Sequence, residues 1–196
     1  MSQPKRGRPP EVDRQHVADV ALRLFDRKGF DAVTMAQVAK AASVSRRTLF
    51  RLFPSKGDLV WEGLAEVLRA VRPHLKTRRT GRRSLAALGQ EVFAVPLRGL
   101  DEPAAGDLAR RRLRLIAASP GLLSHPTLDE LRAVLTELVA ASSGPRDAAP
   151  DLVASAIVGV AFAALLWWAT QDEGVSAREA LSTALASLSR LEAEHW

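Results

Sequence analysis

The sequence predicts an all-α protein of about nine helices, and three observations lead to this fold class. Apolar residues recur at helical spacing, as where Val17, Val20 and Ala21 fall at i, i+3 and i+4. Runs that alternate β-branched or aromatic residues with polar ones are nearly absent, and the chain contains no tyrosine. Pro and Gly clusters separate the periodic segments at helix-like intervals.

Capping residues place the first helices. The first helix ends at Gly29, Thr34 with Gln37 opens a short second helix, and Ser45 opens a third. Ser55 with Asp58 opens a long helix that runs to about residue 76. The arrangement predicts a small three-helix N-terminal domain followed by a long connecting helix.

The remaining chain predicts a larger helical domain. A loop is expected over 77–83, and helices are expected over about 84–98, 104–118, 127–142, 150–171 and 176–194. Two of these helices begin with capping-box pairs, Thr127 with Glu130 and Ser176 with Glu179. We therefore expect a basic arm over 1–11, the small domain over 12–55 and the larger domain over 56–196.

Composition narrows the functional classes. The chain has no cysteine, which excludes disulfides and thiolate metal sites, and its four histidines lack ligand spacing, so we expect no metal and no cofactor. The start of the chain lacks the apolar run of a signal peptide, which favours a cytoplasmic location. Residues 1–83 carry 19 Lys/Arg and 8 Asp/Glu, whereas residues 84–196 carry 9 and 14. This asymmetry fits either a polyanion-binding N-terminal domain or a solvated basic face.

One helix is apolar enough to span a membrane. Residues 152–170 are uncharged, yet acidic residues flank the run and no Lys or Arg anchors it. A helix apolar on every side also suits the centre of a bundle, so we expect a buried helix and no stable membrane insertion. A stripe of Ser155, Gly159 and Ala163 at four-residue spacing would allow a second helix to approach closely.

The segment 34–53, TMAQVAKAASVSRRTLFRLF, predicts a helix-turn-helix. A small internal core is expected from Val38, Ala39, Val44 and Leu49, which leaves polar residues on the outer face of the second helix. An ordinary αα corner is the alternative. In a helix-turn-helix the second helix enters the major groove of double-stranded DNA, where Arg reads guanine and helix N-termini meet phosphates. The DNA-contacting residues expected there are Thr34, Ser45, Arg46, Arg47, Thr48, Phe50, Arg51 and Lys56.

The run LFDRKGFDAVTMAQVAKAASVSRRTLFRLFPSKGDLV resembles the TetR family of bacterial regulators over residues 12–62. The resemblance implies a homodimeric repressor with a palindromic operator and a ligand-binding, dimerising C-terminal domain. Ser43 stands where the family usually has glycine, so this residue must accept a left-handed backbone or the turn must adjust. Phe50 replaces a common tyrosine and removes its phosphate-binding hydroxyl. The arm residues Lys5, Arg6 and Arg8 either follow DNA or form a solvated tail.

The C-terminal half, with RLRLIAASPGLLSHPTL, resembles a subgroup that has an acyl-CoA-like ligand-binding domain and includes regulators of mycofactocin biosynthesis. The implied effector is an amphipathic anion such as an acyl-CoA. Arg112 falls inside the apolar arc of its helix, and either an internal salt bridge or a ligand anion would satisfy it. The expected ligand-binding residues are Arg112, Phe93, Leu115, Ile116, Phe162 and one of Trp167 and Trp168.

Dimerisation is expected through the last two helices, which would form a four-helix bundle with their copies. The expected interface residues are Ser155, Gly159, Ala163, Leu181, Leu185 and Leu188. Two alternative functions remain. A membrane-associated regulator would use the apolar helix, whereas an enzyme acting on the same class of ligand lacks any recognisable nucleophile, phosphate loop or carboxylate pair.

Overall fold

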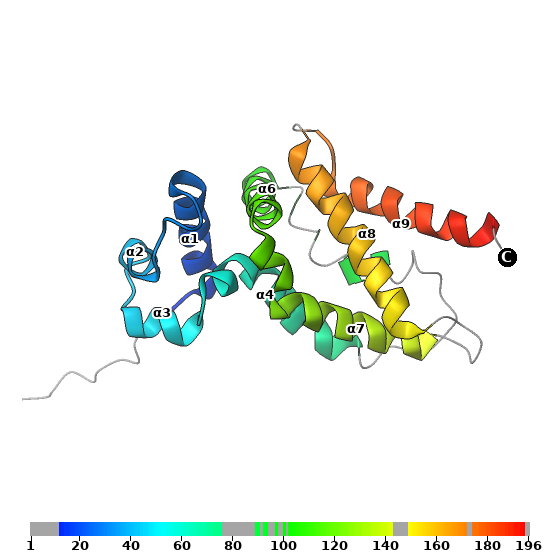
Figure 1. Ribbon diagram of the computed structural model, residues 1–196, viewed down its shortest axis with the longest axis horizontal. Coiled ribbons are helices and arrows are strands. Elements are labelled where there is room, and N and C mark those ends of the chain that lie inside the picture. Colours follow the sequence, from blue (N-terminus) through cyan, green and yellow to red (C-terminus); the bar gives the residue numbers. More distant parts are fainter. Residues whose placement is uncertain are drawn as a thin grey trace, which may run out of the picture.

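The computed structural model describes residues 12–75, 89–90, 92–93, 97, 100, 102–142, 149–171 and 174–194, and all of the regular structure in these ranges is helical. Eight α-helices and one 3₁₀ helix have defined bounds there, which confirms the all-α fold class (Figure 1). The helices are α1 (Arg14–Lys28), α2 (Met35–Ala41), α3 (Arg46–Leu52), α4 (Lys56–Leu75), α6 (Pro103–Ala118), η1 (Pro120–Ser124), α7 (Pro126–Ser142), α8 (Pro150–Thr170) and α9 (Ala177–Glu194). The predicted loop 77–83 and most of the predicted helix 84–98 lie outside the described residues.

Helices α1, α2 and α3 form a small domain at one end of the molecule (Figure 1). Asp13 caps α1, whose last turn ends at Gly29 with a φ of 85°. The apolar face of α1 packs against the two short helices, and Phe25 meets the ring of Phe30 edge-on at 5.1 Å. Phe53, which is fully buried after α3, closes this core.

Helix α4 connects the small domain to the rest of the molecule. It packs against α1 near its start and against α7 further on, while α6 reaches back to contact α1 (Figure 1). Trp61 is buried on α4, stacks on Phe162 at 5.9 Å, and donates a hydrogen bond from Nε1 to the Leu122 carbonyl at 3.0 Å. The two parts of the chain therefore share a continuous apolar core.

Helix α8 packs among α6, α7 and α9, and it is the described helix long and apolar enough to cross a membrane. Core helices of soluble proteins pass the same test, and seven α8 residues are buried inside the protomer. The expectation of a helix buried on every side is wrong for a single protomer, because Leu152 and Trp167 are exposed by 66% and 51%. The opposite side of α8 is therefore left without cover in one chain.

Two local predictions also need correction. Helix α7 begins at Pro126, so Thr127 lies within its first turn and His125 supplies the cap: its Nδ1 accepts a hydrogen bond from the Thr127 backbone N–H at 3.3 Å. Leu181 and Leu185 of α9 are exposed by 2% and 0% and belong to the protomer's own core. They cannot meet a second chain, because their surface is already covered. The side chain of Leu188 lies outside the described residues.

Candidate DNA interface and effector groove

The turn between α2 and α3 is held by backbone hydrogen bonds. The N–H of Val44 donates to the Ala39 carbonyl at 3.0 Å, and the N–H of Ser43 donates to the Lys40 carbonyl at 3.3 Å. This pair of bonds is the Schellman motif, which requires a left-handed residue after the helix end. Ser43 takes that position with a φ of 54°, so the serine accepts the strained conformation and the turn keeps its geometry.

Helix α3 is held in place by a cap at its N-terminus and by a buried residue on its inner face. Ser45 caps it, accepting from the Thr48 backbone N–H at 3.0 Å, while Leu49 is fully buried beneath it. Ala39 is buried where α2 and α3 cross, and its small side chain permits the close approach. The rigid frame points the opposite face of α3 into solvent.

The outer face of α3 carries unpaired cations. Arg46, Arg47 and Arg51 are exposed, and among the residues that the structure describes none of them makes a side-chain hydrogen bond or ion pair. Phe50 lies beside them with 44% of its surface exposed, as expected for a position facing DNA and not the core. Such a basic, aromatic-containing helix face suits the phosphate-lined major groove.

Some of the other residues predicted to contact DNA already make hydrogen bonds within the protein. Thr34 forms a complete capping box with Gln37, and the hydroxyl of Thr48 is within 2.8 Å of the Ser45 hydroxyl. Lys56 Nζ donates to the Phe30 carbonyl at 2.7 Å and lies over the Phe30 ring at 4.5 Å. Lys56 therefore ties the start of α4 to the turn after α1. Lys5, Arg6 and Arg8 lie outside the described residues.

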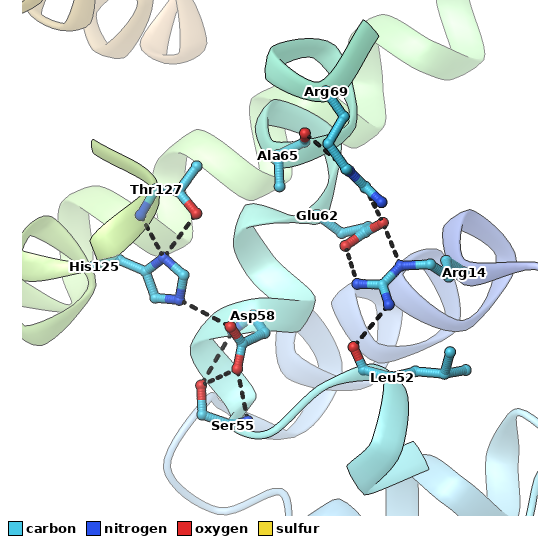
Figure 2. A network of polar contacts seen from close by, with 9 residues as sticks. All are labelled: Arg14, Leu52, Ser55, Asp58, Glu62, Ala65, Arg69, His125 and Thr127. Atoms are coloured by element: carbon cyan, nitrogen blue, oxygen red, sulfur yellow. Dashed lines mark hydrogen bonds and ion pairs between the residues drawn. The ribbon is translucent and has the colours of Figure 1, made fainter. Parts of the chain in front are cut away.

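A buried carboxylate joins the small domain to α4 (Figure 2). Glu62, exposed by 3%, receives two hydrogen bonds from Arg14 of α1, at 2.8 and 2.7 Å, and one from Arg69 at 2.6 Å. Arg14 also donates to the Leu52 carbonyl at the end of α3 at 2.8 Å. Burial by itself raises the pKa of Glu62, but the hydrogen bonds from Arg14 and Arg69 outweigh it and hold the pKa below the ordinary 4.5.

A second polar contact joins His125, the residue before α7, to the start of α4 (Figure 2). Asp58 accepts from the Ser55 backbone N–H at 2.7 Å, which completes the predicted capping box, and its other oxygen lies 3.4 Å from Nε2 of His125. The His125 ring stacks on Trp61 at 5.9 Å and leaves no room for a side chain at Gly57. The C-terminal part of the molecule therefore contacts the start of α4, the helix that follows α3 in the chain.

A groove of about 940 Å³ lies between α1 and α6. Its α1 wall is polar and its α6 wall is mostly apolar apart from Asp107, Arg111 and Arg112. The lining residues are Gln15, Asp19, Arg23, Asp26, Arg27, Leu100, Ala104, Ala105, Asp107, Leu108, Ala109, Arg111 and Arg112. The groove combines charge with apolar surface and is bounded by both parts of the molecule.

Arg112 is buried at this groove without a partner. Its Nε and Nη2 atoms are inaccessible to solvent and have no hydrogen-bond partner, and Nη1 lies close against Gly63 of α4. Burial lowers the pKa of Arg112, and the carboxylates of Asp19, Glu62 and Glu66 offset only part of that effect. Of the two interpretations of Arg112, the internal salt bridge is absent among the described residues.

The neighbouring arginines of α6 are engaged in the fold. Arg110 donates to the carbonyls of Trp168 and Gln171 and stacks on the Trp168 ring at 4.1 Å, while Arg114 donates to the Ala169 carbonyl at 2.7 Å. These bonds satisfy the free carbonyls at the end of α8, where cations are favourable. Arg111 pairs with Asp26 across the groove and with Asp107 at 2.9 Å.

The predicted aromatic ligand residues are not gathered around this groove. Phe93, Ile116 and Trp168 are exposed by 5% or less and belong to the core, while Leu115 and Phe162 pack against it. Trp168 also donates from Nε1 to the Val175 carbonyl at 2.8 Å, which gives it a structural role. Trp167 lines a separate shallow groove of about 470 Å³ between α8 and α9. Of the predicted set, only Arg112 lines the α1–α6 groove.

Sequence reasoning missed the α1 wall of the groove. Gln15, Asp19, Arg23 and Arg27 follow one another at four-residue spacing, which puts them on one face of α1. That polar stripe was visible in the sequence. The identity of the helix that packs opposite it was not, because α6 lies about 85 residues further along the chain.

Comparisons with known proteins agree with this architecture. Residues 17–62 match the family model described as bacterial regulatory proteins, tetR family, and residues 100–192 match the model described as MftR C-terminal domain. The chain is also similar to the mycofactocin biosynthesis transcriptional regulator MftR of Mycobacterium tuberculosis. The two are 32% identical over 94% of this chain and 96% of that protein.

Two solved structures have a similar fold. Thermus thermophilus FadR, a repressor in complex with lauroyl-CoA, superposes with a TM-score of 0.55 at 22% identity, covering 90% of this chain and 93% of that one. Bacillus subtilis FadR in complex with stearoyl-CoA has a TM-score of 0.55 at 19% identity, covering 90% and 98%. With the matched helix-turn-helix and C-terminal domains, the chain belongs to the TetR family of transcriptional regulators and carries an MftR-type C-terminal domain.

Proposed function

We propose that the protein is a homodimeric repressor that binds a palindromic DNA operator through α3 and is released by an amphipathic anion such as an acyl-CoA. The observation that carries the DNA-binding part is the exposed face of α3, where Arg46, Arg47 and Arg51 have no partner among the described residues. Phosphates and guanine edges offer the acceptors that these guanidinium groups lack. Thr34, Ser45, Thr48 and Phe50 would border the same interface, whereas Lys56 would lie beside it with its Nζ bonded to the Phe30 carbonyl.

Selection of duplexes from a random DNA pool tests the operator. The expected product is an inverted repeat, with half-sites centred about one helical turn apart because the two α3 helices of a dimer would face the same side of DNA. Affinity should fall steeply with salt, since phosphate contacts release counterions. Recovery of no preferred duplex, together with salt-independent binding, would contradict the proposed interface.

An acyl-CoA or related amphipathic anion is the proposed effector. The support is threefold: the C-terminal domain matches the MftR type, two structures of similar fold contain acyl-CoAs, and Arg112 lies buried without a partner. A ligand lowers DNA affinity only if it prefers a conformation that DNA does not. Adding lauroyl-CoA to the selected DNA complex should therefore release the protein, and unchanged DNA affinity would rule out this effector.

Dimerisation is proposed to use the uncovered side of α8. Ser155, Gly159 and Ala163 are exposed along it, flanked by Leu152 and Trp167. An added side chain at Gly159 would meet nothing within 4 Å in the protomer. Gly159→Leu should therefore leave the fold intact and push apart two helices that approach closely. Sedimentation should give a weakened dimer, and a dimer as stable as the parent would remove Gly159 from the interface.

The two alternatives have direct tests. A membrane-associated regulator would expose the apolar side of α8 to lipid and would pellet with membranes, whereas the proposed cytoplasmic dimer would remain in the supernatant. An enzyme would convert lauroyl-CoA during incubation. Recovery of the acyl-CoA unchanged from a stoichiometric complex supports a regulatory ligand.

A further inference from the structure

The α1–α6 groove contains polar atoms that require a partner. A buried guanidinium N–H without an acceptor is costly, and native proteins seldom leave one unpaired. Arg112 has two such nitrogens, Nε and Nη2. Gln15 adds a buried acceptor, because its Nε2 donates to Asp19 at 2.8 Å while its Oε1 has no partner. The two walls of the groove therefore contain unsatisfied donors and an unsatisfied acceptor, which lie just beneath its surface and are closed to solvent.

The charge balance of the groove favours an anion. Arg111 pairs with both Asp26 and Asp107, so these three groups together carry one net negative charge. The whole lining, with four arginines and three aspartates, still carries a net charge of +1. Of the remaining lining residues, Arg23, Arg27 and Arg112 are cationic and make no ion pair among the described residues, whereas Asp19 is the single acidic group. Burial raises the pKa of Asp19, which further reduces its negative charge at a given pH.

The groove also offers apolar surface, from Leu100 before α6 and from Ala104, Ala105, Leu108 and Ala109 on α6 itself. Its volume of about 940 Å³ is large enough for a substantial organic molecule and not only for a simple ion. A matching ligand would carry an oxyanion for Arg112, an N–H or O–H donor for Gln15, and an apolar body along α6.

We infer that the acidic group of the effector binds in the α1–α6 groove by parting its walls, so that a carboxylate or phosphate oxyanion accepts hydrogen bonds from the Arg112 nitrogens that are closed to solvent in the unliganded groove and is attracted by Arg23. This inference rests on the proposed effector class and adds the site. It makes α1, a helix of the DNA-binding domain, part of the effector site. The ligand would thus contact the DNA-binding domain directly, in addition to any effect through α4.

The site suggests how binding reaches DNA. Asp26 and Arg111 form an ion pair that spans the groove from α1 to α6. A ligand wedged between the two helices shifts α1 relative to α6, and the rigid core of the small domain carries α3 with it. Because α3 holds the DNA contacts, a small rotation there changes the distance between the two recognition helices of a dimer.

Isothermal calorimetry with the full chain tests the site, with lauroyl-CoA and dodecanoate as separate probes. Arg112→Met should weaken binding of the recognised probe by roughly 10- to 100-fold, as expected for the loss of hydrogen bonds to a charged group. Arg23→Ala, an exposed change that cannot disturb the core, should weaken it by about two- to fivefold and more at low salt. The probe that responds identifies the oxyanion as a phosphate or a carboxylate.

Two matched controls lie outside the groove. Arg132→Met removes an exposed arginine of α7, and Lys28→Ala removes an exposed cation at the end of α1. Both should bind the probes like the parent. Equal affinity of Arg112→Met, Arg23→Ala and the controls would overturn the groove assignment and leave the effector class standing. Failure of the parent to bind either probe would overturn both the effector class and this inference, while the DNA-binding proposal would still stand.

Discussion

Two buried charges near the junction of α1, α4 and α6 differ in one respect. Glu62 is surrounded by three charge-assisted hydrogen bonds from Arg14 and Arg69. Arg112 of α6, whose Nη1 lies against Gly63, the residue after Glu62, has two buried nitrogens with no partner. The Glu62 carboxylate has all of its expected hydrogen-bond partners within the fold, whereas the Arg112 guanidinium lacks partners for two of its nitrogens.

The difference separates structural charges from ligand-facing ones elsewhere in the molecule. Arg110 and Arg114 are bonded to carbonyls at the end of α8, and Lys56 is bonded to the turn after α1. The α3 arginines resemble Arg112 in lacking partners, but they are exposed. We therefore expect paired charges to control stability and unpaired charges to control binding, and substitutions can test this division.

The largest expected effect is on stability, at Glu62. Glu62→Gln removes a charge and leaves Arg14 and Arg69 without their anion. Breaking a fully buried pair costs about 3–5 kcal/mol, and we expect roughly 2–4 kcal/mol because both arginines reach solvent. Urea denaturation monitored by far-UV circular dichroism measures the change. A loss under 1 kcal/mol would show that the network is not structural.

The same variant has a predicted pH dependence. Because the folded pKa of Glu62 lies below 4.5, its stabilising contribution is present above about pH 4.5 and is lost as the pH falls through the folded pKa. The stability difference between parent and Glu62→Gln should therefore shrink in acid. Comparing the two proteins at each pH removes the contribution of Asp19, whose raised pKa acts in the opposite direction.

The next effect is on DNA affinity, at α3. Arg46→Ala or Arg47→Ala should weaken binding to the selected duplex by about 1–3 kcal/mol if the residue reads a base, with the unfolding free energy unchanged. Lys56→Met should lower the unfolding free energy and leave DNA affinity nearly unchanged, since the Lys56 Nζ is bonded within the fold. Fluorescence anisotropy and denaturation of the same samples separate the two. Unaltered DNA binding by both arginine variants would contradict the helix-turn-helix interface.

A smaller effect is expected at the strained turn. Ser43→Gly keeps the Schellman motif and removes the cost of a left-handed serine, so the protein should become more stable by up to about 1 kcal/mol. DNA affinity should stay within twofold of the parent, because the turn already has its final geometry. A loss of stability would mean that the serine side chain contributes more than its backbone strain costs.

The smallest effect on stability is expected at Arg112. Replacing an unpaired buried charge by an apolar side chain of similar length removes a desolvation penalty, so Arg112→Met should change the unfolding free energy by less than about 1 kcal/mol in either direction. Thermal denaturation curves of parent and variant would measure this change in stability. A destabilisation of about 3–5 kcal/mol would instead indicate an ion pair that the fold depends on.

The sequence predicted the parts of the fold that local signals determine. Periodicity and caps located most of the helices. For Ser43 the sequence left two alternatives, a left-handed serine or an adjusted turn, and the structure shows the left-handed serine. The prediction that Thr127 caps α7 was wrong, because His125, two residues earlier, accepts the hydrogen bond that caps this helix. Leu181 and Leu185 were assigned to the dimer because an apolar stripe on a helix does not reveal whether its own chain or a second chain covers it.

The candidate site was predicted in part for a similar reason. Arg112 was noticed because a cation within an apolar arc is a local anomaly. Its surroundings depend on α1 and α4, which are distant in the chain, so the groove and its Gln15 and Arg23 wall came only from the structure. Aromatic residues such as Trp168 fit a ligand cavity and a core equally well from sequence alone, and hydrogen bonds place this one in the core.

The most direct test of the account is release of the selected DNA duplex by lauroyl-CoA, measured by anisotropy for the parent and Arg112→Met. Both proteins should bind the duplex with the same affinity in the absence of lauroyl-CoA. The acyl-CoA should release the parent, and release of the variant should require at least about tenfold more ligand. Release of both proteins at the same lauroyl-CoA concentration would contradict the assignment of the unpaired guanidinium to the effector.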